Sequence, residues 1–296
     1  MLDGFLDVLK SGRPVITCEL NPPKGVALGP LFKKTEALKG LIDAFNIPDS
    51  SSSIMAMAPM SVAHLLNLRD IDTIIHVTGR DRNQIAIQSD LLACHALGVT
   101  NLLCLSGDPP GAGDHPKAKP VFDLNATEIL KAANALSHGR DLSGNSLKGT
   151  PKFQTGAAAN PGAPDLPLEI QRMEEKIAAG ASFFQTQAAY DPFTFERFAK
   201  ATQNLKVPIL AGLIVLKSGN MARNLNANLP GLLISDNVIE ELDASNNKPQ
   251  TSVEVSARII KQIKGMFDGI HIMAIGWENL IPEILETAGF QTSAQV

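Results

Sequence analysis

The sequence predicts a single (β/α)8 barrel, or TIM barrel, of the α/β class, in which every strand is followed by a helix. Eight short apolar runs alternate with segments of helical periodicity along the whole chain. The 296 residues are close to the usual size of such a barrel, roughly 250 residues. An open, doubly wound sheet is the competing fold. We favour the barrel because eight units fill the chain without a second domain.

The predicted strands are apolar runs that end at glycine, proline or a polar residue. They do not alternate strictly between apolar and polar residues, as expected for parallel strands that are buried on both faces. We place them at residues 15–18, 43–47, 73–78, 102–105, 153–158, 182–186, 208–215 and 269–274.

The predicted helices have apolar residues at helical spacing and follow the strands in turn. We expect Asp123 to cap the helix that begins there. Residues 137–151, rich in serine and glycine, indicate a surface insertion within one domain that spans residues 1–296. The helices are placed at residues 2–9, 31–41, 60–68, 83–97, 123–136, 168–179, 192–202, 220–225, 236–242, 253–267 and 277–287.

Composition excludes several classes of protein. The net charge of −4 and the lack of a basic run argue against nucleic-acid binding. Three scattered cysteines and no metal-ligand spacing argue against a disulfide framework and a metal site. No signal peptide is recognisable, and the longest apolar stretch is too short to cross a membrane. We therefore expect a cytoplasmic protein.

Side chains suited to chemistry follow the predicted strands, and in a barrel all carboxyl ends of the strands lie on the face that carries the active site. Each of these side chains could instead be a solvated loop residue or a helix cap with no role in an active site. For Asp49 and Lys217 we favour this non-functional interpretation. These side chains are Glu19, Asp49, Thr78, Asp108, Asn160, Gln187, Lys217 and Trp277.

Glu19 and Asp108 are the candidate acids, from the first and fourth strands. Glutamate is a poor turn former, whereas the Asp108-Pro109 pair could be only a turn. A carboxyl group in a dry pocket has a raised pKa and can donate a proton. His76 lies within the third predicted strand. A histidine in an apolar strand is more often a core residue with satisfied hydrogen bonds than a ligand. Known nucleotide-binding glycine motifs are missing.

Five blocks at the strand ends resemble the methylenetetrahydrofolate reductase family. The resemblance covers nearly the whole chain and implies a (β/α)8 barrel that holds FAD without a Rossmann fold. The blocks are residues 17–24 (TCELNPPK), 78–83 (TGRDRN) with 88–92 (QSDLL), 105–110 (LSGDPP), 184–187 (FQTQ) and Tyr190-Asp191.

The resemblance implies an oxidoreductase of one-carbon metabolism and methionine biosynthesis. Reduced FAD passes a hydride to 5,10-methylenetetrahydrofolate and gives 5-methyltetrahydrofolate, with donor and folate using the flavin in turn. By this resemblance Glu19 is the general acid that assists opening of the five-membered ring. Asp108 lies by the flavin and hydrogen-bonds the pterin, and Gln187 contacts the folate.

The resemblance also implies a set of residues that bind FAD. Taken alone, the spacing of Glu169, Arg172 and Lys176 predicts only a solvated, charge-paired helix face; positive charge there also suits a diphosphate. Asn160 is the weaker match in the set. The implied FAD contacts are His76, Ser106, Gly107, Asp108, Asn160, Glu169, Arg172 and Lys176.

Departures from the family pattern concern the contacts with the folate tail and with the nicotinamide, and through the latter the electron donor. Many members have an aromatic residue after the seventh strand and a basic one after the eighth, where this chain has Lys217 and Trp277. Ala188-Ala189 replace bulkier residues. NAD(P)H, ferredoxin and an electron-donating partner protein stay open as donors, and the oligomeric state, a homo-oligomer included, stays open too.

Two other functions compete with the reductase. The first is a folate-dependent methyltransferase that passes the methyl group to a corrinoid without a flavin. The second is a non-catalytic flavin-binding or folate-binding subunit of a complex. A yellow protein that oxidises methyltetrahydrofolate distinguishes the reductase from both.

Overall fold

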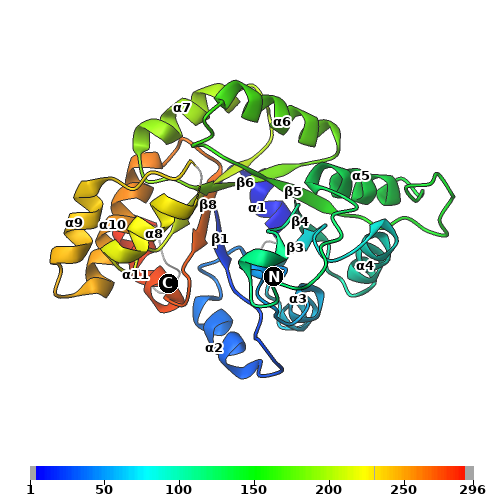
Figure 1. Ribbon diagram of the computed structural model, residues 1–296, viewed down its shortest axis with the longest axis horizontal. Coiled ribbons are helices and arrows are strands. Elements are labelled where there is room, and N and C mark those ends of the chain that lie inside the picture. The colour runs from blue at the N-terminus through cyan, green and yellow to red at the C-terminus, as the bar shows by residue number, and fades with distance from the viewer. Residues whose placement is uncertain (1–4, 230, 291–296) are drawn as a thin grey trace.

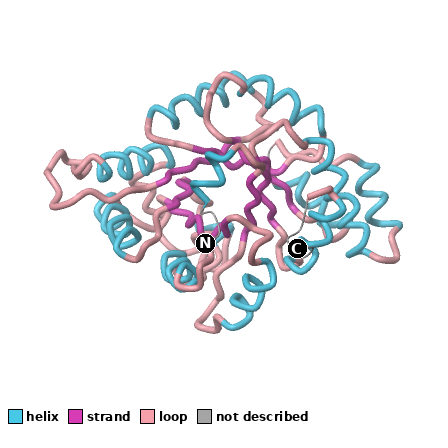
Figure 2. The backbone as a smooth tube through the Cα atoms, turned by 180° about the vertical axis from the view of Figure 1, so that it is seen from behind, coloured by secondary structure: helices cyan, strands magenta, loops and turns pink. Residues whose placement is uncertain are grey.

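The computed structural model describes residues 5–229 and 231–290. Its eight strands are parallel and close into a barrel in sequence order, with β8 pairing with β1 (Figures 1 and 2). The predicted fold is therefore confirmed. The strands are β1 (Val15–Glu19), β2 (Ala44–Ile47), β3 (Thr73–Thr78), β4 (Asn101–Leu105), β5 (Gln154–Ala159), β6 (Phe183–Ala188), β7 (Ile209–Ile214) and β8 (Gly269–Met273).

Helices surround the strands on the outside of the barrel (Figure 2). Short 3-10 turns follow β2, β4 and β8, namely η1 (Ser51–Ser53), η2 (Pro110–Ala112) and η3 (Glu278–Leu280). The α-helices are α1 (Phe5–Ser11), α2 (Gly29–Leu38), α3 (Pro59–Asn67), α4 (Gln84–Ala96), α5 (Ala126–Ser137), α6 (Leu166–Ala178), α7 (Pro192–Thr202), α8 (Gly219–Asn228), α9 (Asp236–Ala244), α10 (Lys248–Ile263) and α11 (Ile281–Thr287).

Helix α1 closes the amino-terminal end of the barrel. Phe5 is fully buried, and its ring meets that of Phe183 edge to face at 5.3 Å between centroids. Its backbone N–H donates to Asp72 Oδ2 at 2.6 Å. This end of the barrel interior is apolar, and Figure 1 shows α1 within the ring of strands. The predicted start of this helix at residue 2 lies outside the described residues.

Above the apolar layer the barrel interior becomes polar. Side chains alternate between the two faces of a strand, so residues two apart point the same way. Val15 and Ala44 belong to the apolar cluster, and Thr17 and Asn46, two residues further on, are buried polar residues. The interior thus changes from apolar to polar toward the carboxyl ends of the strands, the face that we call the mouth.

The predicted cap of the fifth main helix is wrong. Helix α5 begins at Ala126, and Asn125 caps it by accepting a hydrogen bond from the N–H of Glu128, whose carboxylate in turn accepts from the N–H of Asn125. This capping box follows an Asn-x-x-Glu pattern. Asp123 instead accepts from the N–H of Gln84, the first residue of α4.

The structure also moves the boundaries of α10, predicted at residues 253–267. The helix begins at Lys248, and the Asn247 side chain caps it by accepting a hydrogen bond from the N–H of Gln250. A proline in the first turn also favours a helix start at this point. It ends at Ile263, and Phe267 lies in the turn before β8, where its ring packs against Phe195 at 5.5 Å.

Residues 138–153 connect α5 to β5 and include most of the predicted insertion. Within them Arg140 and Ser146 form an antiparallel bridge. The N–H of Leu142 donates to Gln88 Oε1 at 2.8 Å, which fastens the segment to α4. Among the described helices, none is both long and apolar enough to cross a membrane.

Candidate active site at the barrel mouth

Glu19 is the last residue of β1 and is partly buried. Burial raises the pKa of its carboxyl group from 4.5 to about 7, because the ionised form loses the water that stabilises it. The side chain at the end of β1 can therefore keep a proton near neutral pH, as the sequence-based role of an acid requires.

Asp108 lies on the exposed loop after β4, and its backbone is held firmly. The Ser53 hydroxyl donates to the carbonyls of Asp108 and Pro109, at 2.8 and 3.1 Å. Gly113 also packs on this serine, since a Cβ there would lie 1.8 Å from the Ser53 carbonyl oxygen. The turn interpretation and the active-site interpretation are both compatible with this position, because the turn holds the carboxylate at the mouth.

Gly107 permits the turn before Asp108. Its φ of +89° belongs to the left-handed region that favours glycine. A Cβ at this position would lie 3.1 Å from the Cβ atoms of Thr78 and Arg80. Ser106, just before it, accepts a hydrogen bond from the N–H of Ala126 at 3.3 Å, which ties the loop to the start of α5.

The loops after β1, β2 and β4 are fastened to one another. Asp114 pairs with Lys24 and accepts from the N–H of Met55 at 3.0 Å. These contacts, with a further one to His115, hold the pKa of the Asp114 carboxyl well below its usual range. The N–H of Met57 donates to the Pro23 carbonyl at 3.0 Å, so one side of the mouth is a single cross-linked unit.

His76 is buried inside the barrel, and the structure gives it hydrogen-bonding neighbours. Its Nε2 lies 3.0 Å from Asn46 Nδ2, and Asn46 pairs with Gln185. Gln185 Nε2 reaches Thr17 Oγ1 at 3.0 Å, and this hydroxyl lies 3.0 Å from His271 Nδ1. Five polar side chains from β1, β2, β3, β6 and β8 thus form a connected layer beneath the mouth.

Both histidines of this layer are neutral at physiological pH. Burial lowers the pKa of His76 from 6.5 to about 4. Burial, with a smaller effect of His76, lowers the pKa of His271 to about 3. Sequence reasoning missed Gln185 and His271. The signal was present in 184–187 (FQTQ), because the period of two puts Gln185 on the same inward face as Gln187.

Gln187 stands at the mouth end of β6 and is exposed there. A register shift between Gln185 and Ala188 interrupts the pairing of β6 with β7 at this point. Such irregularities often re-aim a side chain next to an active site. Glu19 and Gln187 lie at the mouth ends of β1 and β6, and Asp108 lies in the loop after β4. Among the described residues, no hydrogen bond or ion pair joins these three side chains.

The polar residues of α6 are less exposed than a solvated helix face would be. Glu169 is 6% exposed, and its Oε1 accepts from the N–H of Asn160 at 2.9 Å. Lys176 Nζ donates to the Ala158 carbonyl at 2.7 Å, and burial lowers the pKa of this lysine. Arg172 is exposed, 4.0 Å from Glu169. The solvated-face interpretation holds only for Arg172.

Asp49 has a structural role that the loop interpretation did not predict. Its Oδ2 accepts from the N–H and the hydroxyl of Thr78, at 3.1 and 2.8 Å, and it pairs with Arg82. The carboxylate ties the end of β2 to the end of β3. The Asp49 carboxylate therefore has protein partners instead of being solvated.

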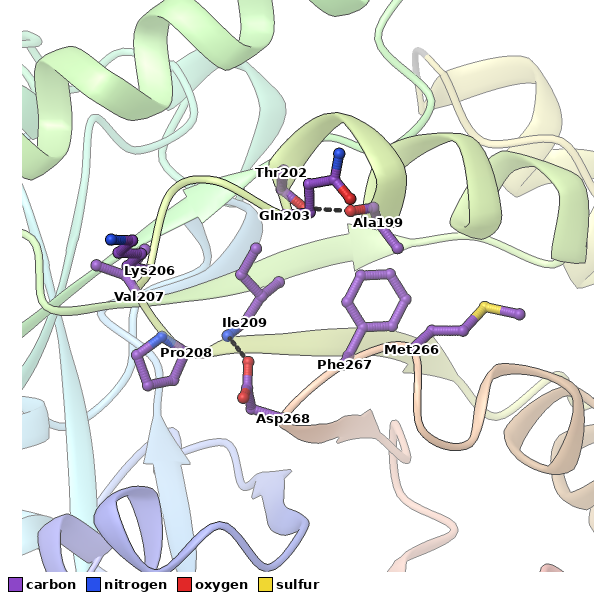
Figure 3. Close-up of a pocket in the computed structure, with 10 residues that line it drawn as sticks. All are labelled: Ala199, Thr202, Gln203, Lys206, Val207, Pro208, Ile209, Met266, Phe267 and Asp268. Atoms are coloured by element: carbon purple, nitrogen blue, oxygen red, sulfur yellow. Dashed lines mark hydrogen bonds between the residues drawn. The ribbon is translucent and has the colours of Figure 1, made fainter.

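A cavity of about 410 Å³ lies at the opposite end of the barrel. Lys206, Pro208, Met266 and Phe267 line it, and Asp268 accepts a hydrogen bond from the N–H of Ile209 beside it (Figure 3). None of the predicted site residues lies there. No cluster of three metal-ligating side chains is found in the described part of the chain.

Similar proteins were found by sequence and by structure. Methylenetetrahydrofolate reductase 2 of Schizosaccharomyces pombe is 24% identical over 316 residues, covering 97% of this chain and 47% of its own length. A probable methylenetetrahydrofolate reductase (NADPH) of Caenorhabditis elegans is 25% identical over 254 residues, covering 81% of this chain and 34% of its own. The chain spans less than half the length of these relatives.

An uncharacterized Clostridium thermocellum protein, described as binding two copies of 5-methyl-5,6,7,8-tetrahydrofolic acid, superposes with a TM-score of 0.57. It is 16% identical and covers 96% of each chain, a likeness that shows the fold. The family model for methylenetetrahydrofolate reductase matches residues 5–289. The chain belongs to the methylenetetrahydrofolate reductase family.

Proposed function

We propose that this barrel catalyses the reduction of 5,10-methylenetetrahydrofolate to 5-methyltetrahydrofolate with FAD as its cofactor. The observation that carries the proposal is Glu19, a partly buried carboxyl group at the end of β1 whose pKa burial raises to about 7. Membership of the family supports the reaction, because its members are generally flavin-dependent.

Glu19 donates a proton to the leaving nitrogen as the five-membered ring of the folate opens. A neutral carboxyl group can do this, whereas a carboxylate with an ordinary pKa would have lost its proton at neutral pH. Asp108 and Gln187 hold the pterin, the one from the loop after β4 and the other from β6. FAD held beside them would supply the hydride once an electron donor has reduced it.

The residues on the β3–β5 side fit such a flavin. A diphosphate needs positive charge, and α6 offers Arg172 on its surface and Lys176 at the end of β5. Gly107 lets the backbone turn without a side chain above Thr78 and Arg80. The residues that would hold the cofactor are His76, Ser106, Gly107, Asp108, Asn160, Glu169, Arg172 and Lys176.

The electron donor is NADH, NADPH, ferredoxin or an electron-donating partner protein. One relative is named for NADPH and others for NADH. Adding each donor separately to the purified protein under anaerobic conditions identifies it, because the flavin absorbance bleaches with the right one.

The test of the function compares two variants. Glu19→Gln should keep the flavin spectrum and lower turnover of methyltetrahydrofolate with an artificial electron acceptor by about a hundred- to ten-thousandfold. Glu36→Gln, on the exposed surface of α2, is the matched control and should keep full activity. A protein that binds no FAD and transfers the methyl group to a corrinoid contradicts the proposal.

A further inference from the structure

Glu19 and Asn46 lie side by side inside the barrel. They are register partners in the parallel pairing of β1 with β2, and neighbouring strands are roughly 4.8 Å apart. Thr17 points into the barrel, where it bonds to Gln185, and Glu19 is two residues further along β1 and points the same way. Asn46 points inward too, because its amide reaches Gln185 on the opposite strand β6. The Asn46 amide is therefore the polar group of β2 beside the Glu19 carboxyl.

The amide of Asn46 nevertheless makes no hydrogen bond to Glu19 in the described structure. A primary amide has two hydrogens to donate. Asn46 donates one to Gln185 Oε1 at 2.6 Å and the other to His76 Nε2 at 3.0 Å. Both hydrogens are therefore directed away from the neighbouring carboxyl group.

Gln185 fixes the direction of this amide. Its Oε1 accepts from Asn46, and its Nε2 donates back to Asn46 Oδ1 at 2.9 Å. Two amides that are bonded in both directions can rotate only by breaking both bonds. Gln185 is 2% exposed, so water cannot replace them. The Asn46 amide therefore stays turned toward β6.

The hydroxyl of Thr17, two residues before Glu19 on β1, is occupied in the same way. It accepts from Gln185 and lies 3.0 Å from His271 Nδ1. Gln185 Nε2 also approaches this nitrogen, at 3.4 Å, so Nδ1 accepts the hydroxyl hydrogen. The amide and hydroxyl hydrogens of the layer are thus donated within it. Neither histidine ring of the layer bonds to Glu19 in the described structure.

The other titratable groups on the elements around Glu19 also form no hydrogen bond or ion pair with its carboxyl group in the part of the chain that the structure describes. Cys18 points outward into the hydrophobic core. Asp49 pairs with Arg82, Glu278 pairs with Lys34, and Lys217 lies over the ring of Trp277. The groups are Cys18 on β1, Asp49 after β2, His76 on β3, Lys217 after β7, His271 on β8, Glu278 in η3 and Lys34 on α2.

We propose that Gln185 is a positioning residue for the acid Glu19: it holds the Asn46 amide toward β6, so that the barrel interior offers the Glu19 carboxylate no hydrogen bond. A hydrogen bond to the charged form of a carboxyl group favours that form and would take the proton from the acid. The raised pKa of Glu19, about 7, agrees with this arrangement. The inference rests on the proposed function, because it explains how the barrel keeps the proton that this reaction uses.

Releasing the Asn46 amide tests the inference directly. NMR of the purified protein with isotope-labelled glutamate side chains follows the titration of Glu19, and Glu19→Gln identifies its signal. Gln185→Met keeps the length of the side chain and frees one amide hydrogen of Asn46. We expect the pKa of Glu19 to fall by about one unit in this variant. An unchanged or higher pKa overturns the inference.

Two control variants separate the freed donor from a general loosening of the barrel. Asn46→Leu combined with Gln185→Met removes the donor and should return the pKa of Glu19 to the wild-type value. Thr17→Val removes a hydrogen bond of the same layer but leaves Asn46 paired, so it should lower stability without lowering this pKa. A lowered pKa in either control shows that loosening is the cause and overturns the inference.

Gln185→Glu is the conservative variant. Its buried carboxyl group, when protonated, can both accept from and donate to the Asn46 amide, so the pKa of Glu19 should not fall. This variant and Thr17→Val keep Asn46 paired, and they test the inference even if Gln185→Met does not fold. A lowered pKa of Glu19 in Gln185→Glu contradicts the role of the amide pair.

The outcomes separate this inference from the proposed function. In an active enzyme, Gln185→Met should shift the loss of turnover of 5,10-methylenetetrahydrofolate to lower pH by about one unit, and the double variant should restore it. The expected pKa changes of Glu19 in a protein without flavin or turnover support the role of Gln185 and contradict the reductase function.

Discussion

The side-chain amides of Asn46 and Gln185 hydrogen-bond to each other in both directions inside the barrel. Asn46 Nδ2 donates to Gln185 Oε1 at 2.6 Å, and Gln185 Nε2 donates to Asn46 Oδ1 at 2.9 Å. Asn46 also donates to His76 Nε2, so this neutral histidine carries its proton on Nδ1. The pair thereby joins β2 to β6 and fixes a tautomer beneath the mouth.

Replacing Gln185 by leucine should destabilise the fold by about 1–3 kcal/mol, because the buried amide of Asn46 loses its partner. Gln185 is only 2% exposed, so water cannot replace the lost bonds. Denaturant unfolding measures the change. Gln262→Leu, on the exposed surface of α10, is the control and should stay within about 0.5 kcal/mol; an equal effect of both variants would refute the role of the amide pair.

Turnover in the reducing direction, with 5,10-methylenetetrahydrofolate as substrate, should decrease as the pH rises through about 7, because Glu19 then loses the proton that it donates. The folded-state pKa lies above the ordinary value of 4.5, so protonated Glu19 favours folding. Its contribution to stability is complete below pH 4.5 and is lost as the pH rises through about 7. Glu19→Gln should remove this dependence from pH profiles of both stability and turnover. A wild-type rate that is flat between pH 6 and 8 would argue against the assigned acid.

Gly107→Ala should cost about 1–2 kcal/mol of stability, because alanine is strained at the φ of +89°. Its Cβ would also press on Thr78 and Arg80 at 3.1 Å. We expect weaker retention of FAD during gel filtration as well. Gly111→Ala, four residues further on in the same loop, meets no atom within 4 Å and is the matched control. Equal loss of flavin from both variants would contradict the prediction.

Ser53→Ala should loosen the loop that carries Asp108, because two hydrogen bonds to its backbone disappear. The expected loss is about 1 kcal/mol, with faster amide hydrogen exchange in residues 106–115. Ser51→Ala, at an exposed position of the same 3-10 turn, should leave exchange unchanged. Unchanged exchange in the Ser53 variant would show that other contacts hold the loop.

The sequence predicted the barrel correctly, because strand and helix periodicities differ and each apolar run ends at a strong breaker. Residues 102–105 followed by Ser106-Gly107 are an example, and β4 ends at Leu105 as predicted. Boundaries were predicted less well where two capping residues competed. Asp123 and Asn125 both precede α5, and the capping box with Glu128 decided between them.

The candidate site was predicted in part. The strand-end rule found Glu19, Asp108 and Gln187, and their roles stay predictions. It missed Gln185 and His271, because a polar residue inside a buried strand shows its partners only when the barrel closes. We favoured a solvated loop residue or a helix cap for Asp49, whereas Thr78 and Arg82 from the neighbouring strand and loop bind its carboxylate.

The sequence by itself determined the order of the elements, the barrel and the set of side chains at the strand ends, because these depend on local periodicity and breakers. The tertiary structure decided what those side chains do to one another. Closing the barrel buried Glu19 enough to raise its pKa, paired Asn46 with Gln185, and brought Lys217 against Trp277. These relationships join residues far apart in the chain, so no local pattern encodes them.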